Sequence, residues 1–386
     1  MLAAVSIGVA SAVNVGKVPL ALGDLRQHFG LSLVQAGWVS SMLTSLAIVA
    51  ALGMGLLVAR AGAWRMASLG LLVAASASAL AFGVHGFEGL LVTRFLEGAG
   101  FMAATVAGPV LVSAATAPAD RRFALGMWSS YMPAGAGLAF ALSPWLLAGW
   151  GWQGLWWFSL LALLLAAAAL WTQRLHYRAA TVAPDEPTEA IWPVLRQPLP
   201  WLLALSFGAW ALQHFALIVW LPTFLREQRG LSAGWVAALS AVMLLANVPG
   251  NLLGGALVQR GWPRGLLVAS AHLVTGLCGW GLFSDAWPDA WRYALCVALS
   301  ATGGLIPAAV MSSSTLLARN ASQISALQGL IMQCSQLGQF VGTPLIASVV
   351  ARSGQWSSAR WVIGCAAVLG LLLGWLAWRL ERQRPQ

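Results

Sequence analysis

Twelve long apolar runs dominate this chain and determine the solvent in which it folds. Each is roughly 20 residues long, enough for an α-helix to cross a hydrocarbon core of about 30 Å. Only 8% of the residues are charged, whereas a soluble protein carries about 25%. The runs are continuous and do not alternate with polar residues, so we predict membrane-spanning helices and not barrel strands. Their approximate limits are 2–23, 34–58, 66–85, 88–113, 123–148, 152–171, 198–224, 233–258, 264–284, 290–317, 322–350 and 357–379.

The basic residues predict how the chain is oriented. Its formal net charge is +10, and with both termini in the cytoplasm the inner loops and tail hold thirteen arginines while the outer loops hold six. Cytoplasmic loops of membrane proteins carry this excess, so the charge indicates topology in the inner (plasma) membrane of a cell. The arginines are scattered over loops and are not interleaved with aromatic residues, so we expect no nucleic-acid partner.

A short phrase occurs twice. "GLSLVQAGWVSS" at 30–41 returns as "GLSAGWVAALS" at 230–240, and "GLLVARAGAWR" at 55–65 returns as "GALVQRGWPR" at 255–264. The second pair matches at a constant offset of 200 residues, and a polar, proline-containing segment divides the two copies. Parallel repeats of this kind build alternating-access transporters with a site near the membrane midplane. We therefore predict an N-terminal six-helix half at 1–171, a cytoplasmic linker at 172–197 and a C-terminal six-helix half at 198–386.

The segment "GLLVARAGAWR" resembles the loop motif of the major facilitator superfamily: glycine, any residue, leucine, any residue, aspartate, arginine, any residue, glycine, then basic residues. In that family the loop stabilises one access state through charged contacts. Ala59 stands where the aspartate belongs, and Gln259 does so in the second copy. The acid of the usual ion pair is thus missing from both copies, which leaves open which groups would form that pair here. The gating residues implied by the resemblance are Gly55, Arg60, Gly62, Arg65 and Arg260.

Further segments resemble the same family. "RFLEGAG" at 94–100 is similar to its motif in the fourth helix, and "GKVPLALGDLRQHFGLS", "GMWSSYMPAGAGLAFALSPWL" and "WLPTFL" are most similar to the branch of cyanate, nitroimidazole and related porters. The resemblance implies an all-α fold of twelve transmembrane helices in two pseudo-symmetric halves. It also implies a monomer whose first, fourth, seventh and tenth helices line the cavity.

Ionisable residues inside the runs are candidate functional residues, because burying a charge in a membrane is costly. Lys17, the only lysine, lies in the first run. It either attracts an anionic substrate, or it reaches the outer headgroups or pairs with Asp24. His214 in the seventh run is either a substrate contact or a packed polar residue, and His272 in the ninth is expected to be a hydrogen-bonded structural histidine.

Arg94 and Glu97 are three residues apart in the fourth run, so their side chains share one face of a helix. They form either a self-compensating ion pair or a functional pair in which Arg94 binds substrate and Glu97 carries a proton. Burial disfavours an ionised carboxylate and a nearby cation favours it, so a substrate arriving beside Arg94 would change the protonation of Glu97. Glu97 is the only acidic residue that we place inside a run.

Weaker candidates complete the expected substrate site. Asn14 lies three positions before Lys17 on the same helix face, Gln213 neighbours His214, and Tyr131 belongs to a possible aromatic wall. Four single cysteines lack metal-ligand spacing, and the P-loop, GxSxG and HExxH motifs are absent, so we expect no metal, no cofactor and no enzymatic activity.

These observations predict a secondary active transporter that moves a small anionic or polar neutral solute by alternating access, coupled to protons. Two fixed cations against one acid within the runs favour an anion. A proton-coupled multidrug exporter is the first alternative, and the aromatic content would suit it. A membrane sensor that binds a ligand without translocating it is the second.

Overall fold

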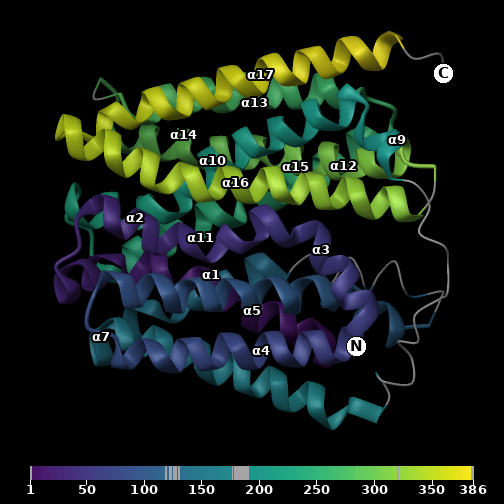
Figure 1. The fold of residues 1–386 in the computed structure, drawn as a ribbon. Helices are drawn as coiled ribbons and strands as arrows, with labels where there is room; N and C mark the ends of the chain where they lie inside the picture. Colours follow the sequence, from purple (N-terminus) through teal and green to yellow (C-terminus); the bar gives the residue numbers. More distant parts are fainter. Residues whose placement is uncertain are drawn as a thin grey trace. The chain divides into compact units, whose positions relative to one another are not determined.

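The computed structural model describes residues 2–117, 131–175, 191–284, 286–319 and 321–383, together with the single positions 120, 124, 128 and 177. The regular structure of these residues is entirely helical (Figure 1). Eleven of the described helices are long and apolar enough to cross a membrane. The prediction of an all-α membrane protein is therefore confirmed.

One helix accounts for the difference between eleven helices and twelve predicted runs. Helix α7 (Tyr131–Thr172) has 42 residues, about 63 Å at 1.5 Å per residue, which is twice the thickness of a hydrocarbon core. Gly151 interrupts it with φ 57° and ψ −154°, a conformation that glycine adopts without a Cβ penalty. The two sides of Gly151 correspond to the fifth and sixth predicted runs, and the start of the fifth, at 123–130, lies largely outside the described residues.

The chain forms two compact units. Unit 1 consists of Met1–Glu186 and Leu221–Ala241, and unit 2 consists of Pro187–Trp220 and Val242–Gln386. Of the predicted linker at 172–197, residues 176 and 178–190 lie outside the described part of the chain. The helices that begin in unit 1 are α1 (Leu2–Phe29), α2 (Leu33–Ser41), η1 (Met42–Thr44), α3 (Ser45–Ala61), α4 (Ala63–Leu80), η2 (Ala81–Gly83), α5 (Phe87–Ala114), α7 and α11 (Ala233–Leu245).

Unit 2 begins with a single turn of helix and contains most of the seventh span. Its helices are α9 (Trp192–Leu195), α10 (Pro198–Glu227), α12 (Asn247–Gln259), α13 (Arg264–Leu282), α14 (Asp289–Gly303), α15 (Leu305–Leu317), α16 (Ala321–Ser353), η4 (Trp356–Ser358) and α17 (Ala359–Gln383). The end of α10, from Leu221 to Glu227, belongs to unit 1.

Small residues let the helices approach closely. A Cβ atom at Gly135 of α7 would lie 2.6 Å from Ala12 Cβ of α1, and one at Gly16 would lie 2.8 Å from Ala136 Cα. In unit 2, a Cβ atom at Gly342 of α16 would lie 2.9 Å from the side chain of Leu212 on α10. Direct contact between helix backbones is the usual role of small residues in membrane helices, so the glycine patterns act as packing sites.

The repeated phrase of the sequence is a turn followed by a helix cap. Gly30 and Gly230 adopt φ values of 64° and 62°, in the left-handed region that favours glycine. Ser32 then caps α2 by accepting from the backbone N–H of Gln35, whose side chain accepts from the backbone N–H of Ser32. This reciprocal capping box fixes the start of α2 in the first copy. In the second copy Trp235 stands at the position of Gln35, and the backbone N–H of Val236 donates to the backbone oxygen of Ser232.

Two ion pairs join the ends of α1 and α10 within unit 1. Arg26 Nη1 lies 2.6 Å from Glu227 Oε1, and Arg226 Nη1 lies 3.2 Å from Asp24 Oδ1. Arg26 and Arg226 are equivalent positions of the repeat, 200 residues apart, and each meets an acid from the other copy. All four side chains are partly exposed.

Candidate functional site

Lys17 lies in a closed polar cluster on the inner face of α1. Its Nζ atom is 2.5 Å from Glu97 Oε1 and donates to Ser78 Oγ at 3.1 Å, and the side chain is 0% exposed. The ammonium also sits 4.4 Å from the centre of the Trp156 ring on α7, a cation–π contact. The alternative that Lys17 reaches the headgroups or pairs with Asp24 is wrong, because Lys17 is buried and Asp24 pairs with Arg226.

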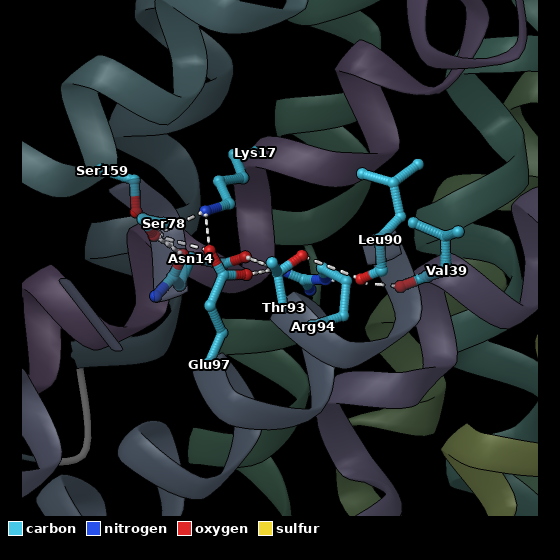
Figure 2. A network of polar contacts seen from close by, with 9 residues as sticks. All are labelled: Asn14, Lys17, Val39, Ser78, Leu90, Thr93, Arg94, Glu97 and Ser159. Carbon is cyan, nitrogen blue, oxygen red and sulfur yellow. Dashed lines mark hydrogen bonds and ion pairs between the residues drawn. The ribbon is translucent and has the colours of Figure 1, made fainter. Parts of the chain in front are cut away.

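Arg94 holds the other side of the same carboxylate. Its Nη1 atom pairs with Glu97 Oε2 and donates to the backbone oxygen of Asn14 at 3.3 Å, while its Nε atom donates to the backbone oxygen of Val39 at 3.3 Å. The predicted ion pair of Arg94 and Glu97 is confirmed, with Lys17 as an additional partner. Three helices, α1, α2 and α5, thus hold the guanidinium in place (Figure 2).

The local chain geometry explains how α5 comes so close to the second span. A short 3₁₀ segment, η1, follows α2 directly, and a Cβ atom at Gly98 of α5 would lie 2.9 Å from Leu43 Cα in that segment. Glycine at 98 therefore lets α5 approach the η1 backbone one residue after Glu97. The sequence "RFLEGAG" carries the charged pair and the small residues that seat it in one stretch.

Hydroxyl and amide groups complete the cluster, as Figure 2 shows. Ser78 of α4 donates to Glu97 Oε1 at 2.5 Å, and Ser159 of α7 donates to Asn14 Oδ1 at 2.9 Å. The sequence predicts Asn14, Lys17 and Arg94 as substrate contacts and Glu97 as the proton carrier, and the structure brings these four residues together. Sequence reasoning missed Ser78, Ser159 and Trp156, since isolated serines and tryptophans in apolar helices are common in this chain.

With each side chain in its ordinary ionised form, the cluster has one formal positive charge in excess. Lys17 and Arg94 are cations, Glu97 is their shared acid, and all three are at most 1% exposed. In the part of the chain that the structure describes, no second carboxylate pairs with either cation. A buried ion cluster is tolerated only when its charges are paired and hydrogen-bonded, and here one cationic charge exceeds the acid available.

The remaining predicted contacts lie elsewhere. Tyr131 of α7 packs against Gly8 of α1, and its ring is tilted against that of Trp128 with 5.0 Å between the ring centres. This described ring contact is not with the charged cluster. Gln213 and His214 belong to unit 2. His214 Nε2 lies 2.9 Å from Ser300 Oγ, and Gln213 Nε2 donates to its own helix at Ala209.

Unit 2 therefore has a polar cluster of its own, which is neutral. The His214 ring stacks on Trp210 at 4.7 Å, and Asn247 Nδ2 donates to the backbone oxygen of Ser300 at 2.9 Å. Asn247 carried no signal in the sequence beyond being polar within a span. His272 behaves as expected of a structural residue, since it is buried and its Nε2 atom meets the backbone oxygen of Ser206 at 3.1 Å.

Comparison with known proteins shows which superfamily has this architecture. The sequence profile of the Major Facilitator Superfamily matches residues 2–343. The chain belongs to this superfamily. It is 26% identical to the cyanate transport protein CynX of Escherichia coli K12 over 91% of this chain and 90% of that protein. It is 28% identical to the 3-(3-hydroxy-phenyl)propionate transporter of the same organism over 66% of this chain and 64% of that one.

A solved structure agrees with the fold. A bacterial homologue of the human lysosomal transporter Spinster superposes with a TM-score of 0.77, covering 99% of this chain and 96% of that one at 15% identity. The predicted resemblance to the superfamily and to its cyanate porters is thereby confirmed. In superfamily terms the charged cluster lies on the first and fourth spans, α1 and α5, with support from α4 and α7.

The loop at 55–65, which resembles the superfamily's motif, has Ala59 in place of the usual acid. Gly62 ends α3 with φ 89°, while Arg60 and Arg65 are exposed and form no ion pair with a described residue. Arg260 caps the C-terminus of α12, where its backbone N–H donates to the backbone oxygen of Ala256. A Cβ atom at Gly55 would meet open space. The side chain of Ala59 lies outside the described part of the chain.

In the second copy, where Gln259 stands at the position of the motif's acid, the last helix supplies a carboxylate near the same loop. Glu381 of α17 accepts from the backbone N–H of Gly265 at 3.0 Å, in the first turn of α13, and its charge acts on Arg264. Acids are favourable at a helix N-terminus, so Glu381 stabilises the start of α13. The described residues include no group of three or more His, Cys, Asp and Glu that could hold a metal ion.

Proposed function

We propose that this protein is a secondary active transporter that carries a small anion together with a proton by alternating access. The observation that carries the proposal is the buried cluster of Lys17, Arg94 and Glu97, with two cations sharing one carboxylate. A cluster with one excess positive charge in a low-dielectric interior favours an anionic ligand. A lipophilic cation would meet repulsion at the same place.

The shared carboxylate supplies a coupling step. Glu97 forms ion pairs with both Lys17 and Arg94. An anion can therefore pair with these two cations only after their ion pairs with Glu97 have broken. A proton on Glu97 removes the negative charge that holds the two cations, and the anion then replaces it. Proton and anion therefore favour each other's binding, which is the condition for symport, whereas competition between them would give antiport.

Charge counting gives the electrical consequence. The empty cluster carries one net positive charge, and protonation of Glu97 raises it to two. A monovalent anion returns it to one. The empty and the loaded carrier then have the same charge, so the movement of one anion with one proton is electroneutral and depends on the pH gradient and not on the membrane potential.

The relatives support an anionic substrate. The printed names of two relatives refer to cyanate and to a phenylpropionate, both of which are monovalent anions near neutral pH. We propose the same class of substrate here, in a monomer with both termini in the cytoplasm and set in the inner membrane. The partly exposed ion pairs at the ends of α1 and α10 each contribute less than about 1 kcal/mol, so they can separate during the cycle.

The test is uptake of labelled cyanate and acetate into proteoliposomes with an inward proton gradient, with the membrane potential clamped at several values. We expect uptake that follows the pH gradient and ignores the potential. Lys17→Met should abolish it, while Arg379→Gln, which removes a cation from α17, should not. Retention of uptake in Lys17→Met would refute the proposal.

The same preparation separates the alternatives. A proton-coupled drug exporter would be stabilised against heat by lipophilic cations and would not lose that stabilisation in Lys17→Met. A sensor would bind an anion in detergent and show no exchange of labelled for unlabelled anion across the liposome membrane.

A further inference from the structure

Two buried N–H donors beside Lys17 have no hydrogen-bond partner. They are Asn14 Nδ2 and Trp156 Nε1, unpaired within the described part of the chain, and both side chains are 0% exposed. A buried donor without an acceptor loses its hydrogen bond to water and gains none in the protein, which destabilises the folded state. Native proteins keep few of them, so two in one cluster require an explanation.

The two donors lie on facing helices around the same ammonium. Asn14 and Lys17 are three residues apart on α1, and Trp156 and Ser159 are three apart on α7, so each pair shares one helix face. Ser159 bonds to Asn14, and the Trp156 ring lies against Lys17. Figure 2 shows the Asn14 nitrogen turned away from the Glu97 carboxylate.

The cluster has more donors than acceptors. Glu97 Oε1 already accepts from Lys17 and Ser78, Glu97 Oε2 pairs with Arg94, and Asn14 Oδ1 accepts from Ser159. The unpaired groups are both donors, and the net charge is positive. The complementary ligand is negatively charged, has several acceptor atoms and needs no donor of its own.

We propose that Asn14 and Trp156 determine the specificity of the site by donating to acceptor atoms of the transported anion that Lys17 and Arg94 leave free. The inference rests on the proposed function and narrows its substrate class to small monovalent anions with at least two hydrogen-bond acceptors. We expect a small ligand, because Asn14, Lys17, Arg94 and Trp156 are at most 1% exposed and leave little room.

The test is isothermal titration of the purified full-length protein in detergent with cyanate and with acetate. Trp156→Phe keeps an aromatic ring at this position and removes the N–H group together with part of the indole, a loss of volume that the control variant Trp152→Phe shares. A hydrogen bond to a charged ligand contributes about 1.5–3 kcal/mol, so we expect the dissociation constant to rise tenfold or more. Trp152→Phe, a buried tryptophan one turn away on the same helix, should bind as the wild type does.

A second variant addresses the other donor. Asn14→Leu keeps the branched shape of the side chain and removes its amide. Ser11→Ala changes a buried polar residue one turn earlier on α1 and is its control. We expect Asn14→Leu to bind the anion more weakly than the wild type and Ser11→Ala to bind it equally well. The melting temperature of each variant without ligand reports whether it is folded.

The outcomes distinguish the two proposals. If the wild type binds neither anion, the proposed function fails and this inference fails with it. If the wild type binds an anion and both Trp156→Phe and Asn14→Leu bind it equally well, the inference alone is overturned. Equal losses in Trp156→Phe and Trp152→Phe would also overturn it, because the effect would then arise from packing.

Discussion

Replacing Glu97 by glutamine tests the charge balance of the cluster most directly. The amide has the shape of the carboxylate and lacks its charge, so the variant leaves Lys17 and Arg94 buried as like charges. At the 2.5 Å separation of Lys17 Nζ and Glu97 Oε1, two unit charges attract by about 7 kcal/mol at an effective dielectric constant of about 20. Part of this offsets desolvation, and removing one partner of a buried pair costs about 3–5 kcal/mol.

The two single-cation variants give the matched comparison. Lys17→Met leaves Arg94 and Glu97 as a neutral pair, and Arg94→Met leaves Lys17 and Glu97 as another. We therefore expect Glu97→Gln to have a free energy of unfolding in detergent at least about 2 kcal/mol below that of either methionine variant. Equal stabilities of the three variants would refute the reasoning, because charge balance would then not govern the cluster.

The same variant tests the coupling step, because glutamine mimics a protonated glutamate. Glu97→Gln should bind cyanate or acetate more tightly than the wild type and gain more thermal stability from it. In liposomes it should exchange labelled for unlabelled anion and show no uptake driven by a pH gradient. Proton-driven uptake by Glu97→Gln would show that another group carries the proton.

Three further predictions concern the scaffold. Gly135→Ala should lower the melting temperature, because its Cβ would lie 2.6 Å from a neighbouring Cβ and overpacking costs about 1–3 kcal/mol, while Gly137→Ala, with open space around it, should leave the temperature unchanged or raise it. Asp24→Asn should lower the free energy of unfolding by less than about 1 kcal/mol, and a double-mutant cycle with Arg226→Gln should give a coupling of that size. Glu381→Ala should lower it by about 1 kcal/mol through loss of the acceptor at the start of α13, whereas Glu381→Gln should retain most of that stability.

The helices were predictable from sequence because the governing quantity is local. A run of about 20 apolar residues satisfies its backbone internally and crosses the bilayer whatever its neighbours are. The exception is α7, where the backbone continues as helix on both sides of Gly151 and one element holds two predicted spans. Two spans can be joined by a loop or by a single glycine in the left-handed conformation. The length of an apolar run does not specify which of the two connections forms.

The charged members of the site were predictable for a related reason. Ionised groups are so costly in a membrane that each needs a partner, so Lys17, Arg94 and Glu97 stood out before their contacts were known. Serines carry no such signal, because a serine in a helix can satisfy itself. Ser11 and Ser143 donate to backbone oxygens within their own helices, whereas the serines at 78 and 159 reach across to other helices. Only the three-dimensional structure distinguishes serines that bond within their own helix from serines that bond to another helix.

The duplication limits how many anions one chain can hold. The offset of 200 residues that relates Gly30 to Gly230 takes Asn14 to His214 and Lys17 to Leu217. The second copy thus keeps a polar group at the first position, where His214 meets a serine hydroxyl, and has a buried leucine at the second. A neutral cluster provides hydrogen bonds without a cation to attract a charge. Each chain should therefore bind one anion, through the cluster of Lys17 and Arg94, and titration of the wild type should give one equivalent.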